Sequence, residues 1–339
     1  MAPSVTARLQ RLTDDATEAQ YLSDVSDRDR RWDVRRRSGE TVEEIFRDFP
    51  HPTFAKWSPR LKQCAQVLEF GWSPDARFEG VLSLKLKRTW FCKVPMCPVC
   101  MWRKSLVKLA RLYTALPELT EDFPNHKWIF LTLTVKNVPV SELREELKQL
   151  HASYKRLTKR EEWKRGIVGW LRSTEVTKGR DGGMRSHPHI HTLAFVKSSY
   201  FSRHYVTQDR WRELWADCAR LDYDPQVDVR KVKPSKKSIE SDGFEPGLRS
   251  AIAETMKYVV KPADLSLSNQ DYVRECAVQL RKVRMMAVGG VLRSYMKDTK
   301  PEQQDLVLGD GDGEGNEKNP GGVRYGWRAD GSPRYSYKG

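Results

Sequence analysis

The sequence predicts an α+β fold in which helices pack on the faces of a central antiparallel sheet. Residues 128–135 are rich in β-branched and aromatic side chains, which is typical of a strand. Two further apolar runs, 166–176 and 188–196, flank a Gly-rich turn at 179–183 and therefore predict a hairpin. Apolar residues at helical spacing over 141–157 predict a helix that covers the sheet.

More helices are expected after the hairpin, at about 207–220, 248–260 and 270–284. We divide the chain into a charged, largely flexible arm (1–50), a small cysteine-containing N-terminal module (51–115), the sheet domain (116–300) and a Gly-rich disordered tail (301–339). The arm alternates acids and bases, and the tail has too few apolar residues to offset the entropy of an ordered chain.

The charge balance favours a polyanionic partner. Lys and Arg number 60 against 45 Asp and Glu, a net charge of +15, and the two ends of the chain carry almost none of this excess. Nucleic acid is the usual partner of so basic a surface. No apolar run is long enough to span a membrane, and the N-terminus lacks the apolar core of an export signal, so we expect a cytoplasmic protein without a membrane partner.

Three histidines lie within five residues: His187, His189 and His191. Alternate side chains of a strand share one face, so His189 and His191 project together, with His187 at the entrance of the strand. Glu175 lies on the opposing strand of the predicted hairpin and supplies an oxygen ligand. The pattern favours a site for one divalent cation, and a polar strand with ordinary hydrogen-bonded histidines is the alternative.

A polar stripe follows on the helix predicted at 248–260. At about 100° per residue, Glu254, Tyr258 and Lys261 share one side of that helix, which Pro262 helps to end. A phenol is a weak nucleophile until a cation or a base assists it, and Lys261 and a bound metal both favour the phenolate. A carboxylate one turn away can serve as a base for water. The alternative is an ordinary surface helix.

Four cysteines are clustered ahead of the first strand. Cys97 and Cys100 form a Cys-Pro-Val-Cys knuckle, Cys92 precedes it by five positions, and Cys64 lies 28 positions before Cys92. Four thiolates can complete a tetrahedral Zn²⁺ site. Two alternatives remain open at this point: His51 as the fourth ligand in place of Cys64, and free buried thiols without a metal.

Taken together, three motifs in order resemble plasmid rolling-circle replication initiators, in the single-tyrosine class of the HUH endonuclease superfamily. The first is the Phe-Leu-Thr-Leu-Thr-Val run at 130–135, and the second is His-Pro-His-Ile-His at 187–191. The third is the Tyr-Val-Val-Lys run at 258–261, with Glu254 one turn before the tyrosine. The resemblance covers about residues 60–296 and implies the HUH endonuclease fold for the sheet domain.

The resemblance implies a concrete activity: metal-dependent, sequence-specific nicking and strand transfer at a plasmid origin. Tyr258 attacks a phosphate of single-stranded or extruded hairpin DNA and becomes linked to the 5′-phosphate. The histidine pair, with Glu175 or His187, holds Mg²⁺ or Mn²⁺. Lys261 steadies the charge, and Glu254 directs termination. The implied partners are the origin DNA and host replication machinery such as a helicase.

Two other classes of protein fit part of the sequence. The run at 187–191 also fits the histidine-triad nucleotide hydrolases, in which a histidine attacks phosphorus without a metal. That class gives no role to the Glu254, Tyr258 and Lys261 stripe. A non-catalytic, zinc-containing DNA-binding protein explains the charge and the cysteines, but it leaves the order of the three motifs as coincidence.

Overall fold

A computed structural model describes residues 14, 20–74, 82–180, 183–232, 248, 251–252, 255, 260, 262–296 and 322–338. The chain forms two compact units. Unit 1 comprises Met1–Val107, Leu265–Leu267 and Lys300–Gly339, and unit 2 comprises Lys108–Asp264 and Ser268–Thr299. Within the described residues, no helix combines the length and the apolar composition needed to cross a bilayer.

Unit 2 is built on an antiparallel sheet in the order β7-β3-β6-β5-β8, with the short β4 also paired to β6. The strands are β3 (Lys127–Thr134), β4 (Val138–Pro139), β5 (Ile167–Lys178), β6 (Arg185–Val196), β7 (Val227–Lys231) and β8 (Met286–Gly290). The prediction of an α+β fold with a central antiparallel sheet is confirmed. The hairpin expected over 167–196 is β5 paired with β6 along nearly its whole length.

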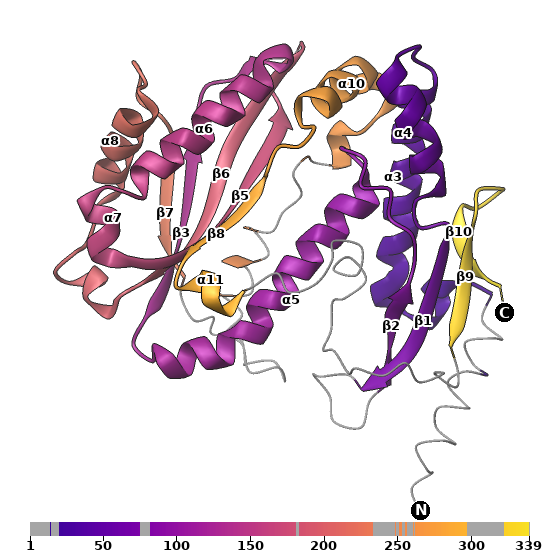
Figure 1. Cartoon of the computed structure of the whole chain (residues 1–339), viewed down its shortest axis with the longest axis horizontal. Helices are drawn as coiled ribbons and strands as arrows, with labels where there is room; N and C mark the ends of the chain where they lie inside the picture. The colour runs from indigo at the N-terminus through magenta and orange to yellow at the C-terminus, as the bar shows by residue number, and fades with distance from the viewer. Residues whose placement is uncertain are drawn as a thin grey trace, which may run out of the picture. The chain divides into compact units, whose positions relative to one another are not determined.

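One face of this sheet is covered by α6 (Leu143–Leu157), which lies beside α8 (Gln208–Ala219) in Figure 1. The Thr192 hydroxyl donates to the Tyr154 hydroxyl of α6 at 3.2 Å. The opposite face carries Leu171, Leu193 and Phe195, which form a buried apolar cluster with the end of α5 (Pro98–Asp122). Both faces of the central strands are therefore buried, which explains their nearly continuous apolar sequence.

The remaining helices of unit 2 are short, and the glycines of β8 explain how one of them joins the sheet. These helices are α7 (Glu161–Gly166), α10 (Gln270–Gln279) and α11 (Leu292–Tyr295). Gly290 has a φ of +61°, and a Cβ there would lie 2.1 Å from the carbonyl oxygen of Val168. Only glycine permits this close approach of β8 to β5, so the strand can end against its neighbour and turn directly into α11.

Unit 1 contains both ends of the described chain. Its helices are α2 (Leu22–Val25), α3 (Arg30–Arg47) and α4 (Pro52–Gln63), together with the first part of α5. Its sheet has the order β10-β9-β1-β2 and is formed by β1 (Val67–Pro74), β2 (Leu82–Arg88), β9 (Val323–Arg328) and β10 (Arg334–Tyr337). β1 pairs with β9 in antiparallel fashion, so strands that are far apart in the sequence lie side by side in this sheet.

This architecture corrects two predictions. The arm expected to be flexible over 1–50 contains α3, whose Trp32 and Phe46 are fully buried. The tail expected to be disordered over 301–339 contains the β9–β10 hairpin, in which Tyr325 and Tyr335 are fully buried. The physical reason is the same in both cases: each segment has few apolar residues, but large aromatic ones supply enough buried surface when the two ends pack together.

Candidate metal centre

The register of the β5–β6 hairpin brings Glu175 and the two histidines to one place. Glu175 pairs with His189, and Ser173 pairs with His191. Because side chains alternate along a strand, these residues share the sheet face of Leu171 and Leu193, opposite α6. Strand alternation and pairing alone therefore assemble two imidazoles and a carboxylate.

The three donor groups converge closely. The Glu175 Oε2 atom lies 3.1 Å from the Nε2 atom of His189 and 3.1 Å from the Nε2 atom of His191. All three residues are buried, with exposed fractions of 4%, 9% and 6% for Glu175, His189 and His191. A separation of about 3 Å is that of neighbouring ligand atoms around an ion with bond lengths of about 2.1 Å. The residues present thus fit one small divalent cation.

Hydrogen bonds to the far side of each ring fix how the imidazoles point. The Nδ1 atom of His191 lies 3.1 Å from the Thr132 hydroxyl on β3, and that of His189 lies 3.3 Å from the carbonyl oxygen of His187. A carbonyl only accepts, so the Nδ1 atom of His189 is the donor in that contact, and its Nε2 atom is the one that faces Glu175 and would ligate a metal. Phe130 also stacks on the His191 ring at 5.5 Å between centroids.

The carboxylate is held in its charged form. Burial by itself raises the pKa of Glu175, but hydrogen bonds from His189 and His191 and their charge outweigh it and leave the pKa well below its ordinary value. An ionised carboxylate is the form that ligates a cation. Glu175 is therefore ready to ligate at neutral pH.

His187 does not join this group. Its Nδ1 atom lies 2.9 Å from the Asn137 Oδ1 atom, at the entrance of β6. The convergent set among the described residues consists of Glu175, His189 and His191, with donor atoms all within 4.8 Å of one another. Strand alternation places the His187 ring beside that of His189, at 5.2 Å between centroids, but its Nδ1 atom contacts Asn137, so this structure does not bring His187 into the ligand group.

The predicted tyrosine stripe, Glu254, Tyr258 and Lys261, lies outside the described residues. Two residues that lie between members of the stripe, Thr255 and Val260, are described. Thr255 is helical and fully buried, and its hydroxyl donates to the Ala251 carbonyl at 2.8 Å. Val260 forms a parallel bridge with Val176. Val260 therefore lies beside β5 at the residue next to Glu175.

The four cysteines also converge, within unit 1. The Sγ atoms of Cys64, Cys92, Cys97 and Cys100 all lie within 4.8 Å of one another. His51 is not part of this group: its Nδ1 atom accepts a hydrogen bond from the Thr53 backbone N–H at 3.1 Å and caps the start of α4. The alternative in which His51 replaces Cys64 is therefore wrong for this structure.

Sequence reasoning missed the residues that orient the imidazoles. Thr132 belongs to the Thr-Leu-Thr run of β3, and it pairs directly with His191 across the sheet. The alternation of that run, with Thr132 and Thr134 on one face, was a usable signal. What the sequence could not supply is which strand lies beside β6, because β3 and β6 are far apart in the chain.

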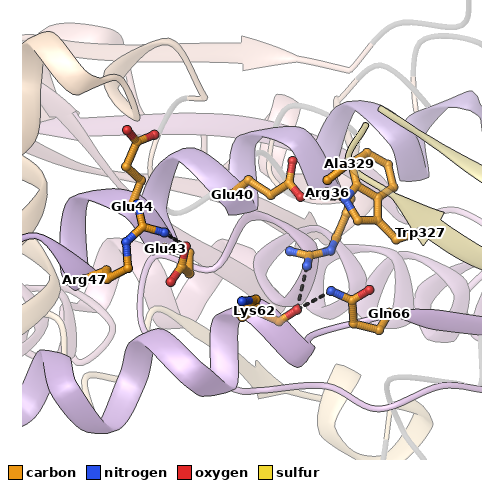
Figure 2. Close-up of a pocket in the computed structure, with 9 residues that line it drawn as sticks. All are labelled: Arg36, Glu40, Glu43, Glu44, Arg47, Lys62, Gln66, Trp327 and Ala329. Atoms are coloured by element: carbon orange, nitrogen blue, oxygen red, sulfur yellow. Dashed lines mark hydrogen bonds and ion pairs between the residues drawn. The ribbon is translucent and has the colours of Figure 1, made fainter. Parts of the chain in front are cut away.

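A separate pocket of about 350 Å³ opens in unit 1 (Figure 2). It is lined by glutamates of α3, by Arg36, and by Trp327 of β9, and its polar groups largely satisfy one another. The Trp327 indole N–H donates to Glu40 at 2.6 Å, and Arg36 donates to the Lys62 carbonyl at 2.6 Å. Three glutamates in the lining are balanced by Arg36, Arg47 and Lys62, so the pocket has no excess of positive charge for a phosphate, and we assign it no part in binding DNA.

Comparison with known proteins gives a consistent result. A family model described as "Replication protein" matches residues 83–336. A protein named "Protein rep" from Streptococcus pneumoniae serotype 2 (strain D39 / NCTC 7466) is 36% identical over 287 residues, which cover 83% of this chain and 84% of that protein. Proteins of the same name from Lactiplantibacillus plantarum (34% identity, 75% and 84% coverage) and Bacillus amyloliquefaciens (33%, 81% and 80%) are also similar. No solved structure matches significantly.

Proposed function

We propose a mechanism from one premise: the chain belongs to the replication protein family and is a plasmid rolling-circle replication initiator. A replication initiator interacts with plasmid origin DNA, and this DNA is the polyanionic partner that the net charge of +15 predicts. The proposal is that the chain nicks one strand of that origin and forms a covalent link to it. The observation that carries it is the convergence of Glu175 with both imidazoles at 3.1 Å.

Glu175, His189 and His191 would hold Mg²⁺ or Mn²⁺. Two imidazole nitrogens favour Mn²⁺, because Mg²⁺ prefers a set made only of oxygen ligands. When bound, the cation polarises a phosphoryl oxygen and stabilises the charge of the transition state. Thr132 orients the His191 ring through Nδ1, so that Nε2 faces Glu175.

Tyr258 is the nucleophile in this proposal. Its phenolic oxygen forms a bond to the scissile phosphorus, the bond from phosphorus to the 3′ oxygen breaks, and the phenolic proton leaves in exchange for one gained by the 3′ oxygen. The products are a 5′-phosphotyrosine and a free 3′-hydroxyl that primes synthesis. The bridge between Val260 and Val176 supports this role, because the chain passes beside Glu175 two residues after Tyr258.

Lys261 and Glu254 complete the proposed reaction. The ammonium of Lys261 stabilises the phenolate or the phosphate charge. Glu254 acts as a base for the water or the hydroxyl that releases the protein after one round. Recruitment of host replication machinery such as a helicase belongs to the same proposal.

The histidine-triad alternative fits the geometry less well. A histidine nucleophile needs a free ring nitrogen that faces phosphorus. Here both Nε2 atoms lie against one buried carboxylate, which is the arrangement of ligands rather than of a nucleophile. A non-catalytic DNA-binding protein remains as one outcome of the experiment.

The test uses the full chain, a single-stranded origin oligonucleotide labelled at its 3′ end, and Mn²⁺. We expect a labelled covalent adduct that survives denaturation. No adduct should form in the presence of a chelator, and adding excess Mn²⁺ should restore its formation. Tyr258→Phe should form none. The matched control is Tyr205→Phe, since Tyr205 is 59% exposed and belongs to neither strand of the hairpin that carries the cation ligands.

Glu254→Ala should form the adduct at a normal rate and release it slowly, which a chase with unlabelled oligonucleotide measures. DNA binding without any adduct, in all conditions, would support the non-catalytic alternative. Cleavage that persists in the chelator would support the histidine-triad alternative.

A further inference from the structure

The cysteine cluster of unit 1 has the dimensions of a closed metal site. The Sγ atoms of Cys64 and Cys100 are 3.6 Å apart, those of Cys92 and Cys100 are 3.7 Å apart, and those of Cys97 and Cys64 are 3.7 Å apart. Ligands of a tetrahedral Zn²⁺ with Zn–S bonds of about 2.3 Å lie about 3.7–3.8 Å from one another. Disulfide sulfurs would lie about 2 Å apart, and all four cysteines are free thiols.

Backbone N–H groups point at the sulfurs. The amides of Cys92, Lys93 and Val94 donate to the Sγ atoms of Cys64, Cys100 and Cys92 at 3.4, 3.3 and 3.4 Å. Such donors stabilise negative charge on sulfur, which neutral thiols do not need. The cluster is thus surrounded by groups that suit thiolates.

The chain around the cysteines adopts conformations that are unfavourable in isolation. Among the described residues, five that are not glycine have positive φ, and three of them adjoin these cysteines: Ala65 (52°), Lys93 (55°) and Met96 (68°). A side chain at positive φ costs about 1–2 kcal/mol relative to its ordinary conformation. Three strained residues beside one cluster indicate a stabilising interaction at the cluster that outweighs this cost.

Burial gives an independent reason for an ion. The four cysteines are at most 2% exposed. A divalent cation deprotonates the thiols that ligate it, and four sulfurs buried this deeply suit a closed structural site.

The residues that follow Cys64 hold the C-terminal hairpin. The Tyr335 hydroxyl donates to the carbonyl of Ala65, and the backbone N–H of Trp327 donates to the carbonyl of Gln66 at 2.9 Å. β1 begins at the next residue and pairs with β9. Any constraint on Cys64 is therefore transmitted directly to β9 and β10.

We propose that Cys64, Cys92, Cys97 and Cys100 bind one structural Zn²⁺, with no open coordination position, and that this ion fastens the C-terminal hairpin (323–337) to the N-terminal helices of unit 1. The ligands come from the end of α4, from the loop before α5 and from the start of α5. The ion takes no part in the proposed chemistry at Glu175, so the two sites can be tested separately.

The first test measures zinc in the purified full chain by elemental mass spectrometry. We expect one Zn²⁺ per chain, retained after brief treatment with a mild chelator. Cys97→Ser should lose most of it, whereas Cys276→Ser, which removes another fully buried thiol, should keep it. Glu175→Gln should also keep it, which separates this site from the proposed catalytic cation. Iron in place of zinc, or no metal in the wild-type chain, would overturn the proposal.

A second test does not depend on the folding of a variant. Wild-type chain produced with Co²⁺ should show the visible absorption of tetrahedral cobalt bound to thiolates. Hydrogen exchange of residues 323–337 should increase at least about tenfold when a strong chelator removes the metal, while exchange of β5 and β6 changes little. Unchanged exchange in the hairpin after complete loss of zinc would show that the ion does not hold it.

Discussion

Two clusters of ligating side chains in this chain are built in opposite ways. Glu175, His189 and His191 come from one hairpin, so a single strand pairing assembles them. The four cysteines come from three separate segments joined by loops with strained residues. We therefore expect the cluster on the sheet to keep its geometry without an ion, and the cluster between the loops to depend on one.

The donor atoms of the two clusters also favour different kinds of metal site. Nitrogen and oxygen ligands with fewer than four protein groups suit an exchangeable cation that also contacts substrate. Four thiolates suit a permanent zinc with no position left for substrate. We therefore expect the fold of unit 2 to be stable without a bound cation, and the fold of unit 1 to be unstable without zinc.

The largest expected effect comes from breaking each cluster once. Glu175→Gln should reduce adduct formation at least about a hundredfold, because it removes the ligand charge. Its Tm should fall by only a few degrees, roughly the effect of one lost charged hydrogen bond. Cys97→Ser should lower the Tm by about 10 °C or more. Calorimetry and the adduct assay check both, and equal Tm losses in the two variants would remove the contrast.

The sheet itself is most sensitive at Gly290. Gly290→Ala should destabilise the chain by about 2–4 kcal/mol, because a Cβ would meet the Val168 carbonyl oxygen and the residue has positive φ. The matched control is Gly183→Ala, which also has positive φ (67°) but nothing within 4 Å, and should cost only about 1 kcal/mol. Denaturant titration measures both. A similar cost at the two positions would mean that the close approach of β8 to β5 is unimportant.

The orientation of His191 gives a smaller effect. Thr132→Val removes the hydroxyl beside Nδ1 and should weaken Mn²⁺ binding about tenfold, with Tm nearly unchanged. Thr134→Val is the control on the same strand face, because its hydroxyl donates to the Gln226 carbonyl instead. Mn²⁺ titration by electron paramagnetic resonance distinguishes them. Equal affinity in both variants would exclude Thr132 as a positioning residue.

The last effect is confined to acid pH and concerns the stability of the opposite sheet face. Burial, with the charge of Arg172, lowers the pKa of His151 to about 3. The unfolded chain binds this proton below its ordinary pKa of about 6.5 and the folded chain does not, so stability falls as the pH drops from 6.5 towards 3. The loss is at most about 1.4 kcal/mol per pH unit.

His151→Gln keeps a hydrogen-bonding group near Thr174 and should flatten this part of the pH profile, while leaving stability above pH 7 nearly parallel to the wild type. Urea titrations at several pH values measure the slope. An unchanged slope would assign the acid sensitivity to other groups, the Glu175 cluster first among them.

Local patterns predicted the parts of the site that lie close in the chain. The 128–135 strand and the 167–196 hairpin were found from periodicity and turn residues, and both are present as β3 and as β5–β6. The joint projection of His189 and His191 followed from strand alternation. Glu175 was placed opposite them because a hairpin limits which residues can meet. The role of Tyr258 stays a prediction.

Contacts between distant segments could not be predicted in this way. Nothing in the run at 130–135 says that Thr132 lies beside His191, and nothing at 187–191 says that His187 turns to Asn137. The ends of the chain were misjudged for the same reason. Neither Trp32 nor Tyr335 has enough apolar neighbours in its own segment to bury its ring, yet the two rings lie 6.4 Å apart between centroids.

The α+β class, the histidine face and the Cys-Pro-Val-Cys knuckle follow from local sequence, because each depends on spacing within a few residues of one strand, turn or knuckle. The tertiary structure alone decided which strands are neighbours, which side chains orient the imidazoles, and how β9 and β10 complete the sheet of unit 1. Those outcomes depend on surfaces that are buried only when segments distant in the chain pack together. The sequence of one segment does not indicate which distant segment it packs against.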